Sequence, residues 1–183
     1  MKKIVGYLVL VLLLVGVAFL VYKAFLPTPP DFFSRIRLFS RTEEVNLYFF
    51  KGEVVIPVVR QVERVRDLEE KLKKVIALLL NGPSEQEKEA GFETALPEGV
   101  ECLSVFVQDG IAFLNFSPQI ESGGGTQTMK ARLQQIVYTA TQFKDVEKVR
   151  FLIDGQPIKY FSSEGLTEVE EPIGRSDLEL EER

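Results

Sequence analysis

Carboxylates are the side chains with the widest scope for chemistry here, because the 183 residues include no His. A glycan-cleaving enzyme needs only two carboxylates, set about 5 to 9 Å apart across a cleft. Four acids lie next to sharp turns where such a pair could form, and they are Glu98, Asp109, Glu121 and Asp154. Turn geometry already explains three of them, because two precede a Gly and one lies in a Pro-Glu-Gly sequence. A hydrolase is therefore an unsupported alternative.

The absence of His also removes the commonest general base near neutral pH, the usual nucleophilic triads and most zinc sites. Cys102 is the only Cys, and without a His to activate it we expect a half-buried apolar filler. A single Cys forms no internal disulfide, so the cysteine count does not indicate whether the protein lies in an oxidising or a reducing compartment. The sequence predicts no catalytic residue, no metal ligand and no cofactor.

Two features are candidates for contact with a ligand or partner. The first is a glycine loop that runs into a predicted helix, where backbone amides could receive a phosphate or carboxylate. It comprises Ser122, Gly123, Gly124, Gly125 and Thr126. It lacks the Lys and spacing of a P-loop, so a flexible connector is the competing interpretation. The second is Tyr48, in an aromatic run whose members cannot all point inward.

The chain begins with a long apolar segment. Ile4 to Tyr22 is uncharged and would span about 28 Å as a helix. A cleaved signal has a shorter apolar region with small residues before the cut, so residues 1–25 are predicted to form an uncleaved transmembrane anchor. A lipid anchor would need a Cys directly after this segment. The basic residues on its two sides are too evenly divided to decide its orientation.

A Pro-containing spacer, residues 26–44, separates this anchor from an acidic domain. Without the first 41 residues, 16 Lys and Arg remain against 26 Asp and Glu. Such a domain is repelled by nucleic acid and by anionic lipid. Nucleic acid is therefore excluded as a partner.

Three hairpin-like units separated by two amphipathic helices are predicted for the domain. The hairpins turn near Gly52, Asp109-Gly110 and Asp154-Gly155, and Pro57 indicates an edge position or a bulge. Asp67 is the predicted cap of the first helix, and the second carries its apolar stripe from Met129 to Ala140. We expect an α+β fold, in which a mixed β-sheet built from hairpins has two main helices packed on one face, preceded by one transmembrane helix. Strand order stays open, and residues 178–183 read as an acidic tail.

Several stretches, in this order, resemble the GerMN domain family of sporulation and germination proteins over residues 45–177. They are Val45 to Phe49, Leu78 to Ser84, Ala95 to Gly99, Leu103 to Phe116, Val137 to Phe143, Val149 to Gly155 and Glu171 to Asp177. The chain departs from the family pattern at Asn115, where an acid is expected. The resemblance carries over no catalytic residue.

The resemblance implies a single-pass protein of the bacterial cytoplasmic membrane with its domain on the extracytoplasmic side. It also implies a fold similar to the ring-building domains of secretion channels. We therefore expect a non-enzymatic module that acts in cell-envelope, sporulation or germination-related assembly through protein binding or self-association. The alternative is a module that binds peptidoglycan or another glycan, which predicts an exposed groove with aromatic and carboxamide side chains. A cell-wall hydrolase ranks below both.

Overall fold

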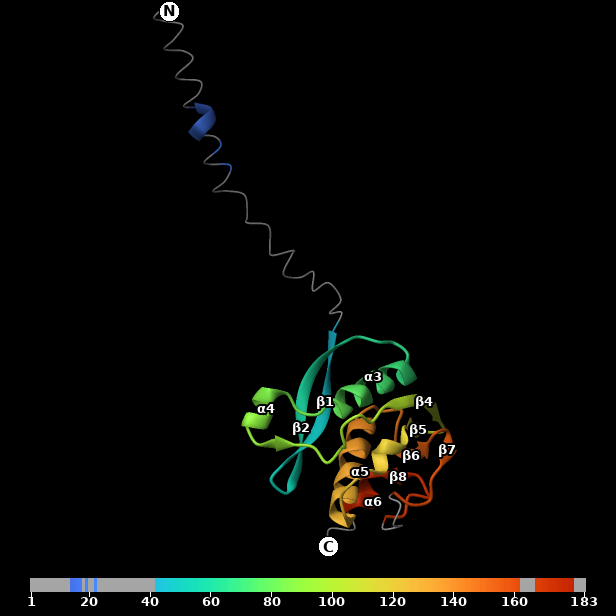
Figure 1. Ribbon diagram of the computed structural model, residues 1–183. Coiled ribbons are helices and arrows are strands. Elements are labelled where there is room, and N and C mark those ends of the chain that lie inside the picture. Colours follow the sequence, from blue (N-terminus) through green and yellow to red (C-terminus); the bar gives the residue numbers. More distant parts are fainter. Residues whose placement is uncertain (1–13, 18, 20–21, 23–41, 162–166, 180–183) are drawn as a thin grey trace, which may run out of the picture. The chain divides into compact units, whose positions relative to one another are not determined.

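The computed structural model describes residues 14–17, 19, 22, 42–161 and 167–179 (Figure 1). The chain divides into two compact units, residues 1–41 and 42–183, and the second is described by itself. Within the described ranges, no helix has both the length and the apolar character needed to cross a bilayer. The anchor predicted over residues 1–25 lies almost entirely outside these ranges, as does most of the spacer, so both stay predictions.

Two separate β-sheets and two principal helices make up the folded unit (Figure 1). The three-stranded sheet has the order β2-β1-β3 and contains β1 (Thr42–Lys51), β2 (Val54–Glu63) and β3 (Phe92–Glu93). The five-stranded sheet contains β4 (Cys102–Gln108), β5 (Ile111–Phe116), β6 (Lys148–Ile153), β7 (Gln156–Pro157) and β8 (Ile173–Gly174). The helices are α3 (Leu68–Leu80), α4 (Glu85–Glu89), the 3₁₀ helix η1 (Pro118–Glu121), α5 (Thr126–Ala140) and α6 (Arg175–Glu179).

The predicted α+β class and the mixed character of the sheet are confirmed, because β5 pairs parallel with β6 and antiparallel with β4. The prediction of one sheet with both helices on one face is wrong. Both α3 and α5 contact both sheets, and one hydrophobic core joins them. The physical reason is that β1 pairs with β3 only at Phe50 and Lys51, and α5 covers the rest of that edge.

The hairpin turns follow the local sequence. Gly52 has φ +66°, and the Asp109-Gly110 and Asp154-Gly155 turns have positive φ at both residues. Asp and Gly tolerate this conformation, which matches the right-handed twist of the strands. The third hairpin is shorter than predicted, because β7 has two residues.

The helix caps agree with the sequence as well. The Asp67 carboxylate accepts a hydrogen bond from the Glu70 N–H at 2.8 Å and begins α3. Ser84 and Glu87 form a capping box at the start of α4. At the other end of the chain, α6 extends into the predicted acidic tail, because Leu178 is buried in the core.

Side chains of α5, together with Gln142 just after its C-terminal end, bind the edge of β1 that β2 leaves free. Gln142 accepts from the Asn46 N–H at 2.7 Å and donates to the Asn46 carbonyl at 2.9 Å. Thr139 accepts from the Tyr48 N–H at 3.2 Å, and Gln135 donates to the Tyr48 carbonyl at 3.0 Å. These three residues lie at i, i+4 and i+7 and satisfy backbone groups that a neighbouring strand would otherwise bind.

Side chains of α3 bind the backbone at the edge of β4 in the same way. Glu69 accepts from the Val107 N–H and Lys73 donates to the Leu103 carbonyl, each at 2.9 Å. The two residues are four apart and therefore share a helix face. At one edge of each sheet, side chains from a principal helix thus bind the backbone groups that a neighbouring strand would otherwise bind.

We predict that Gln135→Leu lowers the free energy of unfolding by about 2 to 4 kcal/mol, because it leaves buried polar groups unpaired. Those groups are the Tyr48 carbonyl and the Ala95 N–H, which donates to the Gln135 carboxamide at 2.7 Å. Urea unfolding measures the change. Gln127→Leu, at an exposed position of the same helix, is the control. Equal stability of the two variants would contradict the role given to Gln135.

Candidate functional site

Strand β2 lies at the edge of its sheet, and within the described ranges no strand pairs with its outer side. Asn46 and Tyr48 of β1 direct their N–H groups toward α5. In an antiparallel pair the residues opposite them then direct their backbone groups away from β1. Those residues are Val59 and Pro57, so the prediction of an edge position for Pro57 is confirmed.

This edge is apolar as well as open. The side chains of Val54 and Val59 are 62% and 56% exposed. Proteins usually protect such an edge with charges, Pro residues, bulges or a covering element, and here Pro57 removes one of the outward N–H groups. The ten residues of β2 therefore form a surface that can accept another strand.

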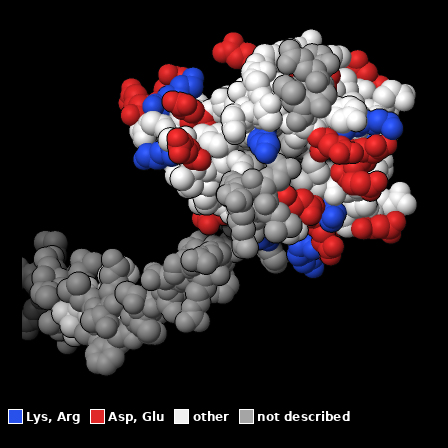
Figure 2. Space-filling view, turned by 90° about the horizontal axis from the view of Figure 1, so that it is seen from below, with Lys and Arg blue, Asp and Glu red and all other residues white. Residues whose placement is uncertain are grey.

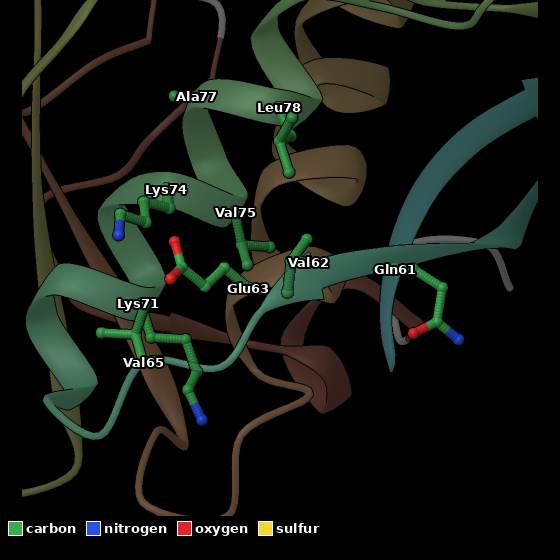
Figure 3. A pocket seen from close by; sticks show the side chains of 9 residues that line it. All are labelled: Gln61, Val62, Glu63, Val65, Lys71, Lys74, Val75, Ala77 and Leu78. Atoms are coloured by element: carbon green, nitrogen blue, oxygen red, sulfur yellow. The ribbon is translucent and has the colours of Figure 1, made fainter. Parts of the chain in front are cut away.

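A groove of about 380 Å³ lies beside the second half of β2, between this strand and α3 (Figure 3). Its apolar lining residues are Val62, Val65, Val75, Ala77 and Leu78. Its polar lining residues are Gln61, Glu63, Lys71 and Lys74, and Figure 3 shows the Glu63 side chain extending from β2 toward α3. A strand edge beside an apolar groove is the arrangement used to bind an added strand, because the groove takes alternate side chains.

The two lysines that line this groove are already paired. The Lys71 ammonium lies 2.9 Å from the Glu43 carboxylate, and the Lys74 ammonium lies 2.9 Å from that of Glu70. The groove therefore favours an apolar occupant over a strongly charged one.

Arg60, on β2, is paired with Glu87 at the start of α4. Hydrogen bonds from Arg60 lower the pKa of the Glu87 carboxyl from 4.5 to about 2, and the Ser84 N–H adds to this effect. The same pair raises the pKa of Arg60. The contact fixes α4 against the sheet.

The predicted glycine loop is held by a buried Arg132, which is 3% exposed. Its guanidinium donates to the carbonyls of Ser122 and Gly123 at 2.6 and 2.8 Å, and also to those of Ile120 and Ala95. Burial lowers the pKa of Arg132. The loop is thus anchored through its carbonyls, and anion binding by the amides near Thr126 stays a prediction.

Tyr48 is engaged within the domain. Its ring packs edge-on against Tyr138, with centroids 5.6 Å apart, and the Arg175 guanidinium lies 5.2 Å from the Tyr48 ring and 5.1 Å from that of Tyr138. Arg175 also donates to the Tyr48 hydroxyl and to the Tyr138 carbonyl. Tyr48 therefore has a structural role, and its contact with a partner stays a prediction. Tyr48 is therefore held by Tyr138 and Arg175, whereas the glycine loop is held by Arg132.

The remaining candidates have local roles. Burial raises the pKa of Cys102 to about 11, as expected for an unreactive thiol. Asn115 accepts from the Gly155 N–H at 2.8 Å and donates to the Ser104 hydroxyl at 3.2 Å, so it joins the Asp154-Gly155 turn to the edge strand β4. Asp109 and Asp154 occupy the left-handed turn positions predicted for them.

Sequence reasoning missed Arg132 and Gln135, which are both buried, and Arg175. Their positions in the sequence could have indicated that Arg132 and Gln135 are buried, because both directly flank apolar stripe residues of α5. Polar residues in such places need buried partners.

The comparisons with known proteins agree on one family. The model of the Germane family, described as "Sporulation and spore germination", matches residues 46–159. The tandem GerMN domains of the sporulation protein GerM from Bacillus subtilis are 21% identical, with a TM-score of 0.58, covering 74% of this chain and 47% of that one. The first GerMN domain alone is 24% identical, with a TM-score of 0.57, covering 74% and 100%.

A putative lipoprotein from Clostridium perfringens is 25% identical, with a TM-score of 0.55, and the match covers 76% of this chain and 91% of that one. No protein with a curated function matches this chain. This chain therefore spans about half of the tandem protein and nearly all of the lipoprotein.

We predict that Gly124→Ala destabilises the domain by about 1 to 3 kcal/mol, because φ is +86° and an added Cβ would lie 2.6 Å from the Thr128 side chain. Gly125→Ala is the matched control, since Gly125 has φ −97° and open space around it. Its effect should stay within about 0.5 kcal/mol. Thermal unfolding compares the two, and equal losses would contradict the backbone argument.

We also predict that Glu87→Gln lowers stability at pH 7 by about 1 to 3 kcal/mol and reduces its loss in acid. Because the folded pKa is depressed, the Glu87 contribution is present above pH 4.5 and disappears as the pH falls toward 2. Denaturant unfolding from pH 7 to pH 2 measures both effects. Glu85→Gln, at a site whose side chain is 85% exposed, should behave like the wild type. Parallel pH profiles for the wild type and Glu87→Gln would refute the pairing.

Proposed function

Because the chain belongs to the Germane family of sporulation and spore germination domains, we propose that it is a non-enzymatic assembly module of the bacterial envelope. In this proposal residues 1–25 anchor the chain in the cytoplasmic membrane, and the domain lies on the extracytoplasmic side. Two observations support this placement. They are the apolar segment from Ile4 to Tyr22 and the similarity to a protein named as a putative lipoprotein.

The observation that carries the proposal is the open edge of β2 beside the apolar groove. The module acts by adding a strand to this edge. Main-chain hydrogen bonds supply the affinity, and the groove selects the alternate side chains. The occupant is a second copy of this chain, which brings its own β2 in the antiparallel direction.

The sequence of β2 favours one register of this pairing. With Val59 opposite Val59 of the second copy, Arg60 lies opposite Val58 and Glu63 opposite Val55, so like charges never meet. Ile56 of the second copy then falls beside Val62, which lines the groove. In the next register, in which Val59 lies opposite Gln61 of the second copy, Arg60 lies opposite Arg60, which is unfavourable.

This register also limits the loss at Pro57. Pro57 lies opposite Gln61 of the second copy, so each such pair lacks one hydrogen bond and keeps the other. The exposed Val59 side chains become buried against each other at the centre of the contact. The arrangement is a closed two-fold interface, because the same surface is used twice.

We predict that Val59→Cys, in a Cys102→Ser background, forms a disulfide-linked dimer under mild oxidation of the full chain in membranes. Directly opposed residues of a hydrogen-bonded antiparallel pair have Cα atoms about 5.5 Å apart, which suits a disulfide. Gln61→Cys is the matched control on the same edge. In this register the two Gln61 positions are four residues apart along the strands, or about 13 Å, and should not link.

Linkage through V59C and not Q61C supports self-association in this register. Linkage through Q61C alone would overturn the register. If neither variant links but V59C is captured by one defined envelope protein, a partner replaces the second copy as the occupant. Absence of any protein linkage would overturn the proposal and leave the glycan-binding alternative.

A further inference from the structure

A second cavity lies between the β1–β2 turn and α5, away from the groove beside α3. Its volume is about 660 Å³, within the range of about 300 to 1,000 Å³ typical of ligand sites. The lining residues are Phe50, Gly52, Glu53, Gln127, Lys130, Ala131, Gln134 and Leu178. They come from the hairpin turn, one face of α5, and α6.

The α5 face is built to leave space. Gln127, Lys130, Ala131 and Gln134 follow the i, i+3, i+4, i+7 spacing of one helix face. That face is distinct from the apolar stripe that enters the core and from the flank that binds β1. Ala131 is too short to fill the space, and an added Cβ at Gly52 would meet nothing within 4 Å. The cavity therefore stays open toward the hairpin turn.

The lining combines one aromatic ring, two carboxamides, one cation and one carboxylate. Phe50 is half-buried and offers an apolar ring surface, on which the C–H face of a sugar can stack. The carboxamide of Gln127 provides both donors and an acceptor. Hydroxyl and acetamido groups have the same dual character, whereas a phosphate would need donors alone and would meet the Glu53 carboxylate.

Figure 2 views the molecule from below Figure 1, the side on which the β1–β2 turn lies, and acidic side chains gather toward the margins of this face. A strongly anionic ligand is disfavoured by a surface of this kind, and a neutral ligand is not. The observations together select a neutral, amide-bearing carbohydrate over a nucleotide or a charged peptide.

We propose that this cavity binds a short chain of N-acetylated hexosamines, with Phe50 as the stacking surface and Gln127 as the group that recognises the acetamido and hydroxyl groups. This site is separate from the β2 edge and adds a second ligand class to the proposed assembly module. One copy of the chain could then hold a glycan strand and a second copy at the same time.

The test is calorimetric titration of the full chain in detergent with a β-1,4-linked tetramer of N-acetylglucosamine. The glucose tetramer with the same linkage serves as the comparison ligand. We expect binding of the acetylated tetramer to be at least about tenfold tighter than that of the glucose tetramer, because only the acetamido groups match the Gln127 carboxamide. Gln127→Ala and Phe50→Leu should each weaken it at least about tenfold.

Gln86→Ala, at an exposed helix glutamine that does not line the cavity, should bind like the wild type. Absence of binding, equal affinity for both tetramers, or wild-type affinity of Gln127→Ala would each overturn the proposal. The crosslink through V59C separates the two proposals. Its presence without glycan binding removes only this site, and its absence with glycan binding removes only the self-association.

Discussion

The backbone N–H and C=O groups at the edges of two small sheets need hydrogen-bond partners, and this need determines how the domain is built. A strand edge presents unpaired N–H and C=O groups, and each such group costs free energy if it is buried without a partner. Here the partners at two edges are side chains in a helix or just after its end, rather than strands. Gln135, Thr139 and Gln142 bind the backbone of β1, and Glu69 and Lys73 bind that of β4. The core can therefore place α3 and α5 against both sheets without a continuous sheet through the molecule.

Helix α5 consequently has three working faces. One is the apolar stripe in the core, one binds the edge of β1 through Gln135 and Thr139, and one lines the cavity beneath the hairpin turn. Arg132 extends the same principle to the loop before the helix, because it binds backbone carbonyls of that loop from a buried position. Arg175 closes the other end by packing between Tyr48 and Tyr138. Within the described ranges, β2 is a long strand whose outer backbone groups are bound neither by another strand nor by helix side chains. This contrast with β1 and β4 supports the use of the β2 edge for an added strand.

The parts of this fold that local chemistry determines could be predicted from the sequence. The Asp-Gly turns, the caps at Asp67 and Ser84, the apolar stripes and the edge position of Pro57 depend on neighbours within a few residues. The division into two sheets could not, because it depends on contacts such as that between Gln142 and Asn46, which are 96 residues apart. Gln and Thr are usually exposed, so their spacing on the flank of α5 gave only a weak signal. Neither the groove nor the cavity could be located, since each is lined by elements that the fold alone brings together.

The central claim is that the β2 edge stays open in a single copy and is covered on association. Amide hydrogen exchange of the full chain in detergent, followed by NMR over a dilution series, tests it directly. The N–H groups of Val59 and Gln61 should exchange rapidly at high dilution and become protected as the concentration rises. Those of Asn46, Tyr48 and Val107, which α5 and α3 side chains bind, should be protected throughout. Protection of Val59 and Gln61 that does not change with concentration would contradict the account, as would rapid exchange at every concentration.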